Sequence, residues 1–345
     1  MKILKFAVLA LALFAAACSK PAPKAAGGQA PVKLVLDWQA EAEHGGYYEA
    51  LATGEYARRG LAVTIVPGGP STNVAQLVAS GQAEFGIGSN SFVVMHLAEQ
   101  SVPVTAVAAF FQKDPQVLIA HPDTGVNSIA DMKGHPILLS DDAITGFWVW
   151  LKAKYGFTDD QVRKYNNSNA PFLADARVVQ QGYLMSEPYT IETQGHIKPV
   201  VFLLADEGYP SYASLVLTSN AYRAGHADVV RAFNEATAAG WRNYLHGDPK
   251  PADDLILKNN PEMSEAVLAQ ARDRMRQTGL VESGDAATGR IGVMTDARWA
   301  DFYRITSAAK GVYEKPFDPR TAYSLDYLPA AQPAATPAAA PAAKP

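Results

Sequence analysis

Short apolar runs rich in β-branched residues alternate with stretches of helical period from residue 32 onward. The apolar runs predict strands at 32–36, 61–66, 85–88 and 104–110. Helices are predicted between them at about 44–59, 72–80 and 91–100, each beginning near Gly, Ser, Thr or Asn residues that can cap free amides. This alternation is typical of an α/β sheet and not of a β-sandwich or a helical bundle.

A second α/β unit follows the first along the chain. Further strands are predicted at 116–119, 183–186, 200–204 and 214–218, with a helix at 143–155, and residues 221 to about 306 have helical period. The chain therefore crosses between two lobes twice, near 116–121 and 206–214, and two crossings make a hinge. We expect lobe I to comprise 32–116 and 214–328, and lobe II to comprise 117–213.

Composition narrows the class of partner. The chain has 345 residues, a hydrophobic share of 48% and a formal net charge of −4. Its 30 Lys and Arg residues are scattered without a basic run, so the electrostatic footprint of a nucleic-acid binder is missing. We expect a monomer whose partner is a small molecule and not a nucleic acid.

Both ends of the chain differ in composition from the body. Residues 1–18 combine two lysines, an apolar run and small residues before Cys18, which is typical of a lipoprotein signal peptide although Ala15 replaces the usual leucine. Cys18 is the only cysteine, and we expect it to be acylated as the first mature residue and to anchor the protein to a membrane of the cell envelope, on the periplasmic side. The alternative is a plain secretory signal with an unused cysteine. Residues 19–31 are expected to be a flexible tether, and 329–345 a Pro/Ala-rich disordered tail.

Enzyme signatures are incomplete in this sequence. The segment GIGSNS at 86–91 has two glycines of a dinucleotide fingerprint but Ser91 in place of the third. The seven histidines show no HExxH spacing, and there is no GxSxG motif. We therefore expect no catalytic residue, no metal and no cofactor.

The predicted strand ends carry the candidate binding chemistry. In an open α/β sheet, ligands bind beyond the carboxyl ends of the strands, where aromatic faces can stack on a ring and polar groups can recognise its edge. The candidate ligand-binding residues at these ends are Asp37, Trp38, His44, Tyr47, Gly68, Gly69, Ser89, Asn90, Gln112, Trp148, Glu187 and Tyr189.

Several candidates also have a purely structural interpretation. Trp38 could be a core indole, and one of Trp148 and Trp150 is expected to serve packing because residues two apart cannot share a helix face. Glu187 before Pro188 could simply end a strand. His44 could contact ligand or cap a helix, while the nearby acids Glu41 and Glu43 are most simply a solvated turn.

Three segments, LVLDWQAEAEHGGYYEA, VAQLVASGQAEFGIGS and VPVTAVAAFFQKDPQVLIAHPDTG, resemble the ABC-transporter substrate-binding proteins related to thiamine-pyrimidine precursor binding and synthesis. The resemblance is close over 32–134 and looser over 180–192. It implies an α/β type II periplasmic-binding-protein fold, with two lobes joined by a two-crossover hinge around a cleft. It also implies a pyrimidine-like ligand, such as a formylaminopyrimidine, delivered to a permease driven by an ATPase.

The resemblance also suggests how the ligand binds. Matching positions are Asp37, Trp38 and His44, the pair Gly68–Gly69, and the pair Gly86–Ile87. We expect Trp38 and the Gly68–Gly69 loop to receive the ligand in an open form, and closure to add Trp148, Glu187 and Tyr189. Glu187 is expected to accept a hydrogen bond from an exocyclic amine.

Other functions stay open. The same fold could bind a sulfonate, a nitrate or a flavin-like ring, and an anion would then use the helix-start amides near 71–72 and 89–91. Relatives that act as pyrimidine synthases carry a lysine, a histidine and a cysteine-rich segment, which this chain lacks at the matching positions. A lipoprotein that binds a partner through a filled cleft is the third alternative.

Overall fold

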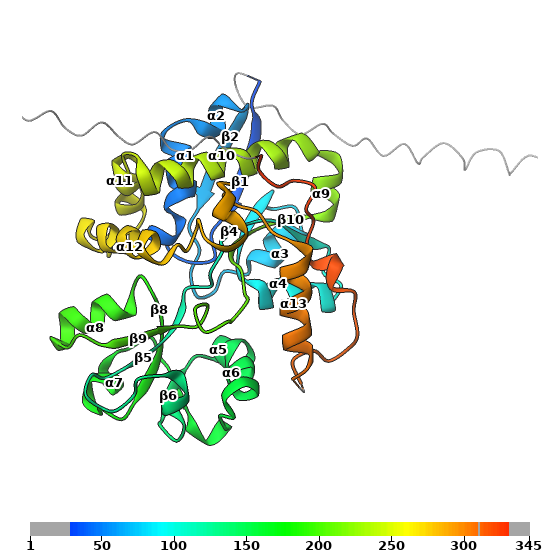
Figure 1. Ribbon diagram of the computed structural model, residues 1–345. Helices are drawn as coiled ribbons and strands as arrows, with labels where there is room; N and C mark the ends of the chain where they lie inside the picture. The colour runs from blue at the N-terminus through cyan, green and yellow to red at the C-terminus, as the bar shows by residue number, and fades with distance from the viewer. Residues whose placement is uncertain (1–27, 310, 331–345) are drawn as a thin grey trace, which may run out of the picture.

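The computed structural model describes residues 28–309 and 311–330 (Figure 1). The predicted signal peptide, Cys18, most of the predicted tether and all but the start of the predicted tail lie outside these residues. Within the described ranges, every helix is too short or too polar to cross a bilayer.

The first sheet has five strands in the order β2-β1-β3-β10-β4. Strand β1 pairs in parallel with β2 and β3, whereas β10 pairs antiparallel with β3 and β4. The strands are β1 (Ala30–Val35), β2 (Leu61–Val66), β3 (Phe85–Asn90), β4 (Val104–Phe111) and β10 (Ala213–Ser219).

The second sheet repeats this arrangement with five strands in the order β7-β6-β8-β5-β9. Strand β6 pairs in parallel with β7 and β8, and β5 pairs antiparallel with β8 and β9. The strands are β5 (Gln116–Ala120), β6 (Ile137–Leu139), β7 (Val162–Lys164), β8 (Val179–Tyr183) and β9 (Val200–Leu203). The chain thus passes between the sheets after β4 and returns after β9, so the fold is mixed α/β with two sheets (Figure 1).

Helices cover both sheets. Those before β10 are η1 (Ala42–His44), α1 (Gly45–Ala52), α2 (Glu55–Arg58), α3 (Val74–Ala79), α4 (Ser91–Glu99), η2 (Ile129–Met132), α5 (Asp141–Thr145), α6 (Phe147–Tyr155), η3 (Asp159–Gln161), α7 (Ala170–Ala174) and α8 (Glu187–Gly195). Those after β10 are α9 (Asn220–Gly225), α10 (Ala227–His246), α11 (Lys250–Asn259), α12 (Glu265–Thr278), η4 (Gly284–Thr288), α13 (Asp296–Ser307) and η5 (Pro319–Ala322).

Three predicted elements are wrong in detail. The helix expected at about 44–59 is divided into α1 and α2, because Gly54 between them has a left-handed backbone with φ 77°. The helix expected at 143–155 is two helices, α5 and α6, because the backbone at Gly146 leaves the helical region with φ −102° and ψ −114°. The strand expected at 183–186 ends at Tyr183 and is followed by a turn, in which Ser186 N donates to Tyr183 O at 2.9 Å. Glu187 therefore begins helix α8 and does not end a strand, and Pro188 is tolerated because it lies in the first helical turn.

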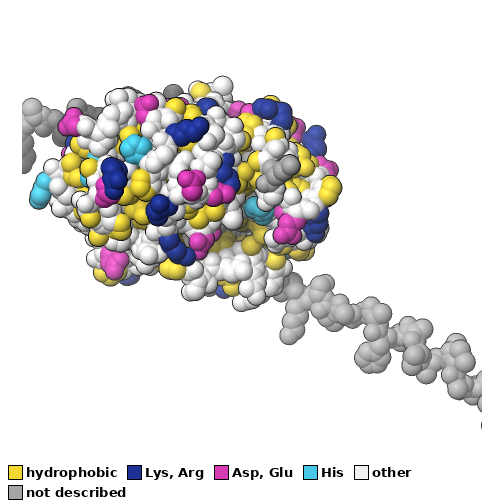
Figure 2. Space-filling view, turned by 90° about the horizontal axis from the view of Figure 1, so that it is seen from below, with side chains coloured by type: hydrophobic (Ala, Val, Ile, Leu, Met, Phe, Trp, Pro, Cys, Tyr) yellow, Lys and Arg dark blue, Asp and Glu magenta, His cyan; other side chains and the backbone are white. Residues whose placement is uncertain are grey.

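Charged side chains are mixed over the surface. On the face seen from below, Lys and Arg side chains lie among Asp and Glu side chains and apolar patches (Figure 2). This distribution agrees with the scattered charges in the sequence.

Helix α1 packs unusually closely on α10 beside the first sheet. Side-chain atoms added at Gly45 and Gly46 would collide with the rings of Tyr244 and Trp241, and one added at Gly240 would collide with the Gly46 carbonyl oxygen. These glycines let the two helices approach until Tyr47 and Trp241 meet edge to face, with ring centroids 6.1 Å apart. The position of α1, which carries Tyr47 toward the strand ends, therefore depends on small residues at this contact.

The replacement Gly46→Ala should destabilise the protein by about 1–3 kcal/mol, since the added methyl group overpacks a closed core. Urea unfolding followed by circular dichroism measures the change. Gly225→Ala is the matched control, because nothing lies within 4 Å of an added Cβ there, and it should stay within about 0.5 kcal/mol of the wild type. Equal stability of the two variants would contradict the close packing of α1 on α10.

Candidate functional site

A small cavity lies at the ends of β1, β3, β4 and β8. It measures about 20 Å³, which is room for about one water molecule. Its lining comes from strands of both sheets, from η1 and from the residue that follows β1; the lining residues are Asp37, Glu43, His44, Ile87, Ser89, Phe111, Tyr183 and Ser214. Tyr183 ends a strand of the second sheet. The cavity therefore lies where the half of the molecule built on the first sheet meets the half built on the second.

Asp37 is the centre of the polar contacts in this cavity. Its Oδ1 lies 3.1 Å from His44 Nε2, and its Oδ2 accepts a hydrogen bond of 2.6 Å from Ser89 Oγ. Burial on its own would raise the pKa of Asp37, but the contacts with His44 and Ser89 outweigh it and lower the pKa below the ordinary value. Asp37 is therefore an ionised acceptor, and His44 donates to it from Nε2.

The acids Glu41 and Glu43 are partly buried, and the expected solvated turn is wrong. Burial, followed by repulsion from Glu41, raises the pKa of Glu43 to about 8. Burial, followed by repulsion from Glu187, raises the pKa of Glu41 to about 7. Glu187 belongs to α8 beside the second sheet, so these carboxyl groups face each other across the contact between the two halves.

Metal binding has no support in the described part of the chain. It contains no group of three or more His, Cys, Asp or Glu side chains arranged to hold a metal ion. The cavity can instead accept hydrogen bonds through Asp37 and exchange protons with a bound molecule through Glu43.

Ser214 has a strained backbone at the cavity wall. Its φ is +48°, in the left-handed region that a serine adopts only at a cost of about 1–3 kcal/mol. This conformation places Ser214 Oγ 3.0 Å from the hydroxyl of Tyr47, which is fully buried. Strain of this kind is concentrated at functional sites, and here it lies in β10 opposite the end of β4.

Several predicted residues surround the cavity without lining it. Trp38 follows Asp37 in the chain and is 38% exposed, and its carbonyl accepts a hydrogen bond of 2.8 Å from Gly68 N. A side chain at Gly68 would collide with Leu36 O, whereas Gly69 has open space around it. The first-sheet positions Asp37, His44 and Ser89 thus come together, with Trp38 and the Gly68–Gly69 loop beside them.

Two further candidates have structural partners. Asn90 Oδ1 accepts from the amides of Phe92 and Val93, at 3.0 and 3.3 Å, and so caps α4. Gln112 is fully buried and donates to Ala109 O and Val293 O at 3.1 and 2.9 Å. Both residues lie at strand ends as predicted, but their side chains support the protein's own backbone.

The candidates near the second sheet lie outside the cavity lining. Trp148 is fully buried in a core cluster and donates from Nε1 to Asp159 Oδ1 at 2.8 Å, so it does not reach the cavity. Glu187 accepts from Tyr183 N at 2.7 Å and from Tyr165 OH at 3.2 Å. Tyr189 is half-buried on α8 and is not part of the cavity lining.

Five lining residues were absent from the predicted ligand-binding residues, although the resemblance had included Ile87 among its matching positions; the five are Glu43, Ile87, Phe111, Tyr183 and Ser214. Phe111 and Ile87 belong to strand ends that the pattern had located, so their position was a usable signal. Tyr183 was assigned to the start of a strand that it in fact ends. The left-handed backbone of Ser214 leaves no trace in the sequence.

Comparison with known proteins identifies the family of this chain. The family model described as NMT1/THI5 like matches residues 41–252. The riboflavin-binding protein RibY of Chloroflexus aurantiacus is 28% identical over 333 residues, 91% of each chain. The formylaminopyrimidine-binding protein of Halalkalibacterium halodurans is 25% identical over 314 residues, 87% of this chain and 92% of that protein.

A solved structure supports the fold. The periplasmic sulfonate-binding protein SsuA from Methylobacillus flagellatus KT aligns with a TM-score of 0.62 at 16% identity, covering 87% of this chain and 92% of the other. The predicted periplasmic-binding-protein fold is therefore confirmed.

The replacement Glu43→Gln should change the pH dependence of stability. The folded-state pKa of Glu43 is raised from the ordinary 4.5 to about 8. Protonated Glu43 therefore makes its full contribution to the free energy of unfolding below pH 4.5, and this contribution is lost as the pH rises through 8. The variant should be more stable than the wild type by about 1–3 kcal/mol at pH 8, with a smaller difference at pH 5. Urea unfolding at both pH values measures this.

The exposed Glu192→Gln on α8 is the control and should show no such pH dependence. A difference between Glu43→Gln and the wild type that is the same at pH 5 and pH 8 would contradict the buried state of Glu43.

Proposed function

Because the chain belongs to the NMT1/THI5-like family, we propose that it is the substrate-binding component of an ABC importer, anchored to the cell-envelope membrane through acylated Cys18. Its ligand is a small planar nitrogen heterocycle with a pyrimidine ring, which it delivers to a permease driven by an ATPase. The observation that carries this proposal is the charge of the cavity lining.

The lining favours a ligand that donates hydrogen bonds. Asp37 has a lowered pKa and presents an ionised carboxylate, and no Lys or Arg is among the lining residues. An ionised acceptor attracts N–H groups and repels anions. The exocyclic amino and formylamino N–H groups of a formylaminopyrimidine are such donors, whereas its unprotonated ring nitrogens are acceptors.

An anionic ligand has less support. A sulfonate or nitrate would need the free amides at helix starts. The starts of α3 and α4 are already capped by side chains of this chain, since Asn73 accepts from Gln76 N at 3.0 Å and Asn90 accepts from the first amides of α4. These amides are therefore not free for an anion.

Aromatic residues from both halves suit a planar ring. Phe111 lines the cavity from the first sheet and Tyr183 from the second. The present volume of about 20 Å³ is far below the roughly 300 Å³ or more of small-molecule sites, so a ring enters only when the halves separate. Ligand then stabilises the closed form by contacting both halves, with Trp38 and the Gly68–Gly69 loop at the entrance.

A flavin is the second candidate. The relative from Chloroflexus aurantiacus binds riboflavin by its name, and the one from Halalkalibacterium halodurans binds a formylaminopyrimidine. Both ligands are planar nitrogen heterocycles that contain a pyrimidine ring. The two candidates share the chemistry that Asp37 recognises and differ in size.

Thermal unfolding with a panel of compounds tests the proposed ligand class. The panel contains a formylaminopyrimidine, riboflavin, an alkanesulfonate and nitrate. At least one heterocycle should raise the unfolding midpoint, since a ligand present at 100 times its Kd adds about 2.7 kcal/mol of stability. A shift with the sulfonate or nitrate alone, or with none of the compounds, would refute the proposal.

Two carboxylate variants test which acid contacts the ligand. Asp37→Asn should weaken binding of the best heterocycle by about 10- to 100-fold, because a charge-assisted hydrogen bond is lost. Glu187→Gln should weaken it if Glu187 accepts from the exocyclic amine, and an unchanged Kd would remove Glu187 from the site. The exposed Asp160→Asn is the control, and calorimetric titration gives each Kd.

A further inference from the structure

Two short segments carry the chain between the sheets. The first crossover, 112–115, joins β4 to β5, and the second, 204–212, joins β9 to β10. An exposed ion pair links them directly, with Lys113 Nζ 2.6 Å from Asp206 Oδ1. Any opening of the cavity must bend both segments.

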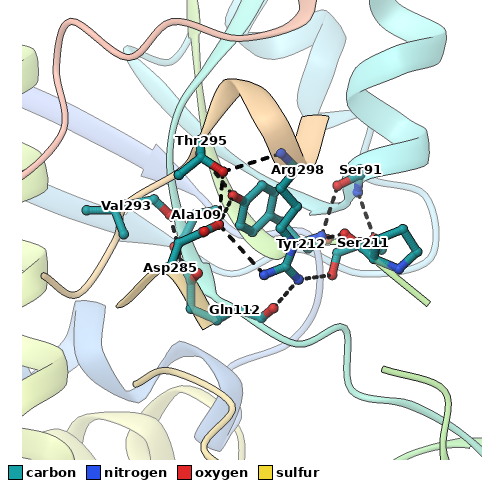
Figure 3. A network of polar contacts seen from close by, with 10 residues as sticks. Ser91, Ala109, Gln112, Ser211, Tyr212, Asp285, Val293, Thr295 and Arg298 are labelled. Atoms are coloured by element: carbon teal, nitrogen blue, oxygen red, sulfur yellow. Dashed lines mark hydrogen bonds and ion pairs between the residues drawn. The ribbon is translucent and has the colours of Figure 1, made fainter. Parts of the chain in front are cut away.

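The partly buried guanidinium of Arg298 joins the two crossovers. Arg298, in the first turn of α13, donates from Nη2 to the carbonyl of Gln112 in the first crossover. The same nitrogen donates to Ser211 O at 3.1 Å, and Nε donates to Pro210 O at 3.0 Å, both in the second crossover (Figure 3). The guanidinium carbon also lies 4.1 Å from the centre of the Tyr212 ring. One side chain from the C-terminal part of the chain thus contacts both connections.

Neighbouring groups hold Arg298 and Tyr212 in place. Asp285 accepts from the Tyr212 hydroxyl and lies 3.9 Å from Arg298 Nη1. The Tyr212 hydroxyl accepts from Thr295 N at 3.0 Å (Figure 3). The network therefore connects the second crossover with η4 and α13, which pack beside the first sheet.

We propose that Arg298 is the positioning residue of the hinge: it fixes the first-sheet ends of both crossovers, so that the halves pivot about 113–115 and 204–209. Because Ala213 of β10 pairs with Phe111 of β4, these ends lie side by side in either arrangement, and the fork of donors keeps them from bending independently. That closure serves to capture a ligand rests on the proposed function. The motion itself can be measured without ligand.

Asp114 lies in the pivot segment 113–115, and its protonation is linked to the opening and closing of the hinge. It is 1% exposed, Oδ1 accepts from Gln116 N at 3.2 Å, and Oδ2 has no hydrogen-bond partner among the described residues. The groups facing it are Arg298, the hydroxyl of Ser211, and the phenols of Tyr183 and Tyr209. Burial raises the pKa of Asp114 to about 7, although contacts with Gln116, Ser211 and Arg298 oppose the rise.

The sign of the pH effect follows from this burial. The closed arrangement holds Asp114 protonated, whereas opening would hydrate it and return its pKa toward the ordinary 3.8. Raising the pH through 7 therefore favours the open arrangement. Loss of the Arg298 charge would raise the pKa of Asp114 further.

Distances between spin labels test the hinge in the ligand-free full chain. Labels are placed at Gln76→Cys on α3 and Gln194→Cys on α8, both exposed, with Cys18 replaced by Ser so that only these positions react. Arg298→Lys keeps the charge but not the fork of donors, and Arg298→Met removes both. Arg304→Met, at an exposed position on the same helix, is the matched control.

Both Arg298 variants should broaden the distance distribution relative to the wild type, because the crossover ends can then bend independently, whereas Arg304→Met should leave the distribution unchanged. If Arg298→Met does not fold, Arg298→Lys carries the test. A distance distribution for Arg298→Lys equal to that of Arg304→Met would overturn the proposal, whether or not any heterocycle binds.

The pH profile separates a hinge role from a merely structural one. In the wild type, the long-distance population should rise between pH 6 and pH 8, and Asp114→Asn should remove part of this rise. Glu41 and Glu43 titrate in the same range but are common to both proteins, so the difference belongs to Asp114. An identical profile in Asp114→Asn would overturn the assignment of the pivot to this segment.

Discussion

The partly buried, ionised carboxylate of Asp37 holds together the segments that meet at the strand ends. An ionised acid away from water costs several kcal/mol unless it is hydrogen-bonded, and here His44 Nε2 and Ser89 Oγ supply the partners. These contacts tie the end of β1 to η1 and to β3, and they fix which nitrogen of His44 carries the proton. They also leave an acceptor at the cavity wall, which is the basis for expecting a ligand that donates hydrogen bonds.

The cavity and the hinge are parts of one mechanical arrangement. Phe111 at the end of β4 lines the cavity, and the next residue, Gln112, gives its carbonyl to Arg298. On the returning chain, Ser211 is held by Arg298, while Ser214, three residues later, bonds to Tyr47 at the cavity wall. A change at the crossovers therefore reaches the cavity through a few residues of rigid strand. The C-terminal helix α13 takes part in this coupling although it lies far along the sequence from the other elements.

The short apolar runs and the turn residues between them predicted the strands of the first sheet closely, because each run is bounded by polar or glycine-containing segments. The break at Gly146 and the early end of β8 at Tyr183 were missed, since both depend on local backbone geometry. At the site, Asp37, His44 and Ser89 could be predicted because strand ends of one sheet meet at one edge. Trp148 could not be distinguished from a core residue by its sequence context. The raised pKa of Glu41 depends in part on the charge of Glu187 in α8, far along the chain, which no local pattern reveals.

The central claim is that the Asp37 carboxylate selects a nitrogen heterocycle. Mass spectrometry of the small molecule that copurifies with the full chain tests it most directly, because the cell then offers all candidate ligands together. The account predicts a planar compound with a pyrimidine ring, bound at about one molecule per chain as expected for a single cleft, and absent from protein carrying Asp37→Ala. Recovery of a sulfonate or another anion, retained equally by Asp37→Ala, would contradict it.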